Sequence, residues 1–170
     1  MGYIHDVNMI AVLPAELCQV SDTQAWSDAV SSNVWSRNRA AGATSFVLKV
    51  PVFLPQNSAA QRGAYFRAVE IWWEVTTDAL TSLAAAVYKA TLPANGDAFG
   101  APAVQAVAYD TGHDTAGERV TVDQHKMTLT LATPIWLDDG DLVYVEISVT
   151  APATSVFKYY GARLTYTLRL

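Results

Sequence analysis

The chain is short of cysteine and of charge, and each shortage limits what the protein can be. Its single cysteine, Cys18, cannot form an internal disulfide, so no covalent bond staples the fold. Charged residues make up 16% of the sequence, against about 25% in ordinary globular chains. Such a low charge predicts a surface that partly faces other protein rather than water. The alternative is that a β protein rich in alanine and threonine simply carries few charges.

Basic stripes and long apolar runs are also missing. The net charge is −5 and the 11 lysines and arginines are scattered, so we expect no nucleic-acid partner. No run approaches the roughly 18 apolar residues of a membrane span. The first residues lack the basic and apolar regions of a secretory signal. The sequence therefore predicts a soluble protein made in a cytosol, without a membrane partner.

The residues needed for catalysis are few and scattered. The three histidines, His5, His113 and His125, accompany no recognisable nucleophile motif. Glu70 and Glu74 share a strand face but stand about 13 Å apart at strand rise, too far for the usual carboxylate pair of a glycosidase. There is no glycine-rich phosphate loop. We therefore predict a protein that is not an enzyme and needs no cofactor.

What the sequence does have is alternation of apolar and polar residues, most clearly in residues 127–170. Three successive strands are expected there, and their inward positions are Met127, Leu129 and Leu131, then Val143, Val145, Ile147 and Val149, then Tyr160, Ala162, Leu164, Tyr166, Leu168 and Leu170. A period of two indicates strands with one buried face, which is typical of antiparallel sheets.

The same period extends back to residue 44. Residues 44–54 predict a strand that Pro51 places at a sheet edge or at a bulge. Residues 65–75 predict another strand, with Trp73 inward and Trp72 outward. With turn signals every eight to twelve residues, we count about eight strands. The predicted fold is all-β: an antiparallel β-sandwich or jelly roll over residues 44–170.

Residues 1–43 differ from this pattern and predict an irregular N-terminal arm. Ser21, Asp22 and Thr23 could cap a short helix, in which apolar residues recur at helical spacing. Trp26 and Trp35 stand in an otherwise polar stretch. Large aromatic residues in such a segment indicate docking, either on the chain's own sandwich or on a neighbouring subunit.

Two groups of residues could bind a metal. Asp138, Asp139 and Asp141 could offer oxygen ligands to Ca²⁺, although Asp-Asp-Gly-Asp is also favourable turn chemistry. The preferred interpretation is a tight hairpin turn between the first two of the three strands expected in residues 127–170. His113 and Asp114 with His125 form a weaker pattern for a transition metal.

Trp72, outward between two glutamates, is the unusual aromatic of the sandwich. Its ring could stack on a sugar, lie in a subunit interface, or be covered by the N-terminal segment. The sequence leaves these three possibilities open.

Several stretches carry a family resemblance: Ile71-Trp72-Trp73-Glu74-Val75, Trp136-Leu137-Asp138-Asp139-Gly140-Asp141, and Phe157-Lys158-Tyr159-Tyr160-Gly161. They resemble small β-sandwich proteins among the structural proteins of tailed bacteriophages. The resemblance implies a virion component assembled in the host cytoplasm, foremost a capsid decoration (cement) protein. It further implies a homotrimer that contacts the major capsid protein. The partner-binding residues expected on this hypothesis are Trp26, Trp35, Trp72 and Tyr159.

A second hypothesis comes from another class of protein. The chain could be a fibre tip or a carbohydrate-binding module with Trp72, Tyr159 or Tyr160 as a stacking platform. A glycan would then be the partner.

Overall fold

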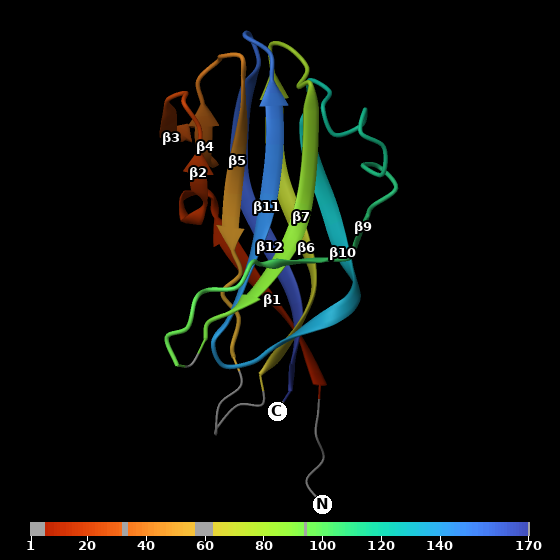
Figure 1. Ribbon diagram of the computed structural model, residues 1–170. Helices are drawn as coiled ribbons and strands as arrows, with labels where there is room; N and C mark the ends of the chain where they lie inside the picture. Colours follow the sequence, from red (N-terminus) through yellow and green to blue (C-terminus); the bar gives the residue numbers. More distant parts are fainter. Residues whose placement is uncertain (1–5, 32–33, 57–62, 94, 170) are drawn as a thin grey trace, which may run out of the picture.

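The computed structural model is a β-sandwich of two antiparallel sheets packed face to face (Figure 1). The structure describes residues 6–31, 34–56, 63–93 and 95–169, and these ranges hold twelve strands and one 3-10 turn, η1 (Ala15–Leu17). The predicted all-β sandwich is confirmed, with more strands than the eight expected. His5, residues 57–62 of the predicted loop, and Leu170 lie outside the described residues.

One sheet, called sheet A here, has seven strands and the other, sheet B, has five. Sheet A consists of β1 (Asp6–Pro14), β3 (Trp26–Ser31), β4 (Val34–Arg39), β6 (Ala64–Thr76), β9 (Val107–Tyr109), β10 (Gln124–Leu137) and β12 (Val156–Arg169). Its order is β3-β4-β12-β6-β10-β9, and β1 also pairs with β12. Sheet B has the order β2-β5-β11-β7-β8, with β2 (Gln19–Ser21), β5 (Thr44–Pro51), β7 (Ser82–Thr91), β8 (Ala103–Gln105) and β11 (Asp141–Ala151).

The core lies between the sheets and follows the alternation in the sequence. Leu48 and Val145 from sheet B and Phe66 and Leu164 from sheet A are fully buried in one continuous cluster. Burying one such side chain contributes about 1.5–3 kcal/mol, which is why the register of each strand is tightly specified. Within the described ranges, no helix is long or apolar enough to cross a membrane.

The strands predicted in residues 127–170 are present, but they do not form one meander. The turn between β10 and β11 is tight: the Asp141 amide donates to the Asp138 carbonyl over 3.1 Å, and Gly140 has a φ of 79°. β10 nevertheless belongs to sheet A and β11 to sheet B, so the turn crosses the sandwich. The expected hairpin pairing of these strands is therefore wrong, because alternation reports a buried face and not a neighbouring strand.

The described residues of the segment predicted as an N-terminal arm are instead built into both sheets. β1 pairs with β12 along all nine of its residues, and β2 pairs with β5. The expected helix after residue 21 is wrong, because β3 and β4 form an antiparallel hairpin that continues sheet A beside β12. Apolar residues four apart fit a helix turn and a period of two equally well, so spacing alone did not separate the two structures.

The buried guanidinium of Arg39 anchors this hairpin to the rest of the N-terminal segment. Its Nε donates to Asp22 Oδ2 over 2.6 Å, and both side chains are almost completely buried. The indole Nε1 of Trp26 donates to the same oxygen over 3.0 Å, and the Trp26 ring packs edge-on against Phe46 and Phe157. Asp22 is thus the shared acceptor for Arg39 and Trp26, rather than part of a helix cap.

Pro51 is the last residue of β5. It lies opposite Tyr144 of β11 and beyond β2, which pairs only with residues 47–49. Its missing N–H therefore interrupts no ladder, in agreement with its expected position at an edge.

Candidate functional site: the outer face of sheet A

The outer face of sheet A gathers aromatic and charged side chains around Trp72. Strand β6 lies between β12 and β10, and its residues alternate as predicted, with Ile71, Trp73 and Val75 buried. We call the opposite side the Trp72 face; it consists of Glu70, Trp72 and Glu74 of β6, Lys158, Tyr160 and Arg163 of β12, and Gln124 and Lys126 of β10.

A β-bulge in β12 puts Tyr160 on this face. The register of β12 against β6 shifts between Tyr159 and Gly161, so Tyr159 points into the core and Tyr160 points outward. Gly161 has a φ of 125°, and a Cβ there would lie 2.5 Å from the Leu13 carbonyl oxygen. Only glycine fits this position without strain. The expected inward position of Tyr160 is therefore wrong, because the bulge turns Tyr159 inward in its place.

Glu70 connects the two strands that flank Trp72. One of its carboxylate oxygens lies 2.6 Å from Lys126 Nζ, and the other accepts a hydrogen bond from Arg163 Nε. The hydrogen bond from Arg163, followed by the contribution of Lys126, holds the pKa of Glu70 below its ordinary value despite burial. The carboxylate is therefore ionised and oriented.

The same two cations frame the indole ring. Lys126 Nζ lies 5.8 Å and the Arg163 guanidinium carbon 5.7 Å from the centre of the Trp72 ring. Both distances are within the reach of a cation–π interaction. The Trp72 ring is half-buried, so its position is fixed while part of it is open to a ligand.

Glu74 organises the neighbouring part of the face. It accepts hydrogen bonds from Tyr160 Oη and from Lys158 Nζ, the latter over 3.1 Å. Burial alone raises the pKa of Glu74, but these two partners outweigh it, so the pKa is lowered. Burial and the bond to Glu74 raise the pKa of Tyr160 to about 12. Tyr160 is thus a protonated phenol that Glu74 holds on the same face as Trp72.

A shallow hollow of about 240 Å³ lies between these rings. It is lined by Trp72, Trp73, Gln124, His125 and Tyr160. The amide of Gln124 can donate and accept hydrogen bonds there. The hollow therefore combines aromatic surface with an uncharged polar group.

Charge on the Trp72 face differs from that of the whole chain. Lys126, Lys158 and Arg163 against Glu70 and Glu74 give three positive and two negative charges, a surplus of one positive charge. The chain as a whole carries −5. The face is therefore almost neutral, with every one of these charges held in an ion pair.

The predicted partner-binding residues do not form one surface. Trp72 lies on the outer face of sheet A, whereas Trp35 is an exposed residue of β4, 53% accessible, and Trp26 is half-buried against the core. Tyr159 is completely buried. Its assignment as a surface contact is not compatible with the fold, whereas the neighbouring Tyr160 lies on the Trp72 face.

The acidic turn is occupied by internal contacts. The Asp141 carboxylate lies 2.7 Å from Lys89 Nζ and accepts hydrogen bonds from Thr91 Oγ1 and the Asp138 amide, each over 2.7 Å. These internal contacts of Asp141 agree with the interpretation of this sequence as a turn. In the described part of the chain, no three His, Cys, Asp or Glu side chains cluster as metal ligands would.

His113 and His125 do meet, although Asp114 is not their partner. His125 Nδ1 lies 3.4 Å from His113 Nε2, and His113 Nδ1 lies 2.8 Å from Asp110 Oδ1. His125 also stacks on Trp73 with 4.8 Å between ring centres. The loop between β9 and β10 brings together the two histidines that the sequence grouped, with Asp110 as the carboxylate partner in place of the expected Asp114.

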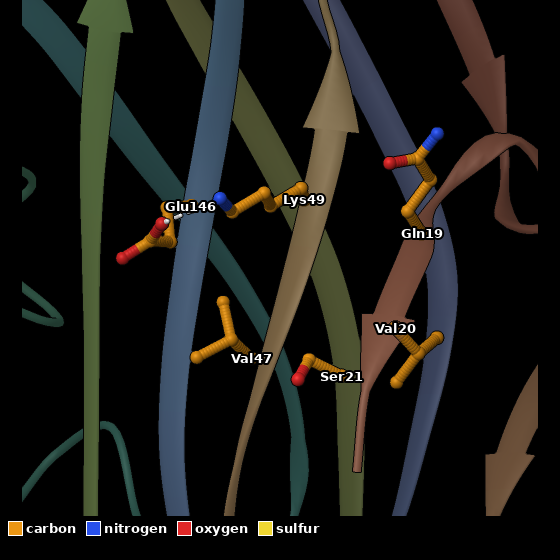
Figure 2. A pocket seen from close by; sticks show the side chains of 6 residues that line it. All are labelled: Gln19, Val20, Ser21, Val47, Lys49 and Glu146. Carbon is orange, nitrogen blue, oxygen red and sulfur yellow. Dashed lines mark ion pairs between the residues drawn. The ribbon is translucent and has the colours of Figure 1, made fainter. Parts of the chain in front are cut away.

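The outer face of sheet B offers a different surface. Gln19, Val20, Ser21, Val47, Lys49 and Glu146 line a hollow of about 340 Å³ (Figure 2). Lys49 Nζ lies 3.7 Å from Glu146, and no aromatic ring lines the hollow. Beside it, the rings of Tyr88 and Tyr144 stack on each other at 5.2 Å. One face of each ring is therefore already occupied.

Sequence reasoning found Trp72 and missed the residues that hold it. Lys126 and Arg163 lie 54 and 91 positions after Trp72 in the chain, and only strand pairing brings them beside the indole. The sequence held one signal for these residues: each is a charged residue at an outward position of a strand that flanks the outward tryptophan.

Comparisons with known proteins show low similarity throughout. No protein-family model matches the chain, and none of the curated proteins matches it. Among solved structures, TmCBM61 in complex with β-1,4-galactotriose is 15% identical, with a TM-score of 0.39, 92% of this chain and 86% of that chain covered. The family 11 carbohydrate-binding module of Clostridium thermocellum, in complex with a β-1,3-1,4-mixed-linked tetrasaccharide, is 9% identical, with a TM-score of 0.32, and 96% and 89% covered. The arabinose-bound α-L-arabinofuranosidase MgGH51 is 9% identical, with a TM-score of 0.43; 91% of this chain but only 24% of that chain is covered.

Proposed function

We propose that the protein is a carbohydrate-binding β-sandwich without catalytic activity that holds a sugar on the Trp72 face. The observation that carries the proposal is a half-buried indole held by two nearby cations, with a second outward ring, Tyr160, on the lining of the same hollow. The C–H faces of a pyranose stack on such rings, because aromatic faces carry negative partial charge.

The polar groups around the rings suit the hydroxyl groups of a sugar. Glu70 holds Lys126 and Arg163 in place, so these two cations offer hydrogen-bond donors with little loss of side-chain entropy on binding. The near balance of charge on the face favours a neutral sugar over a strongly anionic one.

The test is a screen of neutral oligosaccharides on a glycan array, followed by calorimetry on the best ligand. The Trp72→Ala variant should lose at least about tenfold in affinity, since a stacked ring contributes on the order of 1.5 kcal/mol. The matched control is Tyr144→Ala, which removes a half-buried ring from the outer face of sheet B. An equal loss in both variants, or no binding by the unsubstituted protein, would refute the proposal.

The capsid-decoration hypothesis gains no support from the structure or from the comparisons. It stays a prediction, as do the homotrimer, the major capsid protein as partner, and the location in a virion.

A further inference from the structure

Strand β1 forms an open edge of sheet A. It pairs along its nine residues with β12, and its other side has no strand partner among the described residues. Figure 1 shows β1, in red, crossing behind sheet B. A row of unpaired N–H and C=O groups is a template for a further strand.

The other edges carry the features that prevent such pairing. β2, β8 and β9 have three residues each, and β3 presents the charged Asp28 with a side chain 55% exposed. Short strands and charges are the usual protection of a sheet edge. β1 has nine residues, and its one charged residue, Asp6, stands at its first position, since residues 7–14 are all uncharged.

Apolar side chains of β1 are exposed on both sides of the sheet. Ile10 and Val12 lie on the outer side, opposite Thr165 and Arg163, with exposed fractions of 60% and 72%. Val7 and Met9 lie on the other side and are 37% and 36% exposed. Apolar residues on both faces of an open edge fit another apolar strand, and a charged or strongly polar partner would gain nothing from them.

We propose that β1 pairs antiparallel with β1 of a second copy of this chain. Full overlap of Asp6–Pro14 with itself centres the pairing on Ile10. Ile10 then lies opposite its counterpart, Met9 opposite Ala11, and Val7 opposite Leu13. The two Asp6 residues lie eight positions apart, about 27 Å at strand rise, so their charges are screened from one another.

This pairing joins the two A sheets into one continuous sheet. Its two-fold axis is perpendicular to the sheet, because antiparallel strands in one sheet are related in that way. Both Trp72 faces then lie on the same side of the dimer. Resting on the proposed function, the dimer would bind one polysaccharide chain or glycan surface at two points, which raises its apparent affinity without any new contact.

The first test uses cysteine cross-linking of the full chain. Ile10→Cys places two thiols directly opposite each other, at a Cβ separation of about 5 Å, and mild oxidation should yield a disulfide-linked dimer. Val12→Cys is the matched control, because its two thiols stand about 13 Å apart, beyond disulfide reach. Cys18 is buried and can stay in place. Equal cross-linking of the two variants, or cross-linking of neither, overturns the proposal.

The second test measures mass by light scattering over a range of concentrations. The unsubstituted protein should reach the mass of a dimer, and Ile10→Lys should weaken dimerisation at least about tenfold, since like charges then meet at the axis. Val104→Lys on β8, where the side chain is 64% exposed, should leave the dimer intact. A monomer at every concentration, a trimer, or an intact dimer of Ile10→Lys contradicts the pairing.

These readouts contain no sugar. A dimer with no glycan affinity would leave the β1 pairing standing and refute the proposed function alone. A monomer that binds sugar would do the reverse.

Discussion

Lys126 lies directly opposite Trp72 in the ladder between β10 and β6, with its ammonium nitrogen 5.8 Å from the centre of the indole ring. The same nitrogen lies 2.6 Å from the Glu70 carboxylate. One carboxylate thus anchors a cation that in turn fixes the ring proposed to bind sugar. The arrangement makes Glu70 a positioning residue for Trp72.

Replacing Glu70 should weaken sugar binding without unfolding the protein. Glu70→Gln removes the charge that orients Lys126 and Arg163, so we expect a loss of about three- to tenfold in affinity, the equivalent of roughly 1 kcal/mol for partly exposed charge-assisted bonds. Calorimetry with the best oligosaccharide measures it. Glu146→Gln, which loses the ion pair with Lys49 on sheet B, is the control and should bind normally. A Glu70→Gln variant with full affinity would remove Glu70 from the site.

Gly161 should be intolerant of any side chain. Gly161→Ala introduces a Cβ that would lie 2.5 Å from the Leu13 carbonyl oxygen, at a φ of 125°. We expect a loss of about 2 kcal/mol or more in the free energy of unfolding, from strain of this kind, measured by urea denaturation. Gly117→Ala has no atom within 4 Å of its new Cβ and should lie close to the unsubstituted protein. Similar stabilities of the two variants would contradict the bulge.

The buried pair of Asp22 and Arg39 should anchor the N-terminal segment. Removing one partner of a buried pair leaves an uncompensated charge and costs about 3–5 kcal/mol. Asp22→Ala and Arg39→Ala should each show such a loss, and the double variant should lose much less than their sum. Denaturation of the three variants measures this coupling. Additive losses would show that the two side chains are not energetically coupled and would contradict this prediction.

Acid should destabilise the protein through Asp22. Burial raises the pKa of Asp22, but the Gln24 amide and the bonds from Arg39 and Trp26 outweigh it, so the folded pKa lies below the ordinary 3.8. As the pH falls, the Asp22 carboxyl of the unfolded chain therefore takes up its proton at a higher pH than that of the folded protein. The stability that Asp22 contributes above pH 3.8 is lost as the pH falls through the folded pKa.

The measurement is the free energy of unfolding from pH 6 downward. Below the ordinary pKa of an aspartate, the free energy of unfolding should change less steeply with pH in Asp22→Asn than in the unsubstituted protein. The variant lacks one group that binds a proton on unfolding. The exposed Glu16→Gln variant is the control and should keep the slope. The same slope in Asp22→Asn would contradict the assignment.

Strand positions could be read from the sequence, but strand neighbours could not. The alternation of β6, β10, β11 and β12 identified buried residues such as Trp73 and Val145, because burial of one face requires a period of two. It did not reveal that β10 and β11 belong to different sheets. The same alternation satisfies a hairpin and a crossing between sheets.

The candidate site likewise divides into features that the sequence revealed and features that only the tertiary structure revealed. Sequence alone determined that this chain folds as a β-sandwich and that Trp72 faces outward, since both follow from a local period. Only the tertiary structure decided that Tyr160 and not Tyr159 reaches the surface, that Lys126 and Arg163 frame the ring, and that residues 6–39 complete both sheets. Those outcomes depend on a bulge and on pairing between residues far apart in the chain, and neither leaves a periodic signal in the sequence.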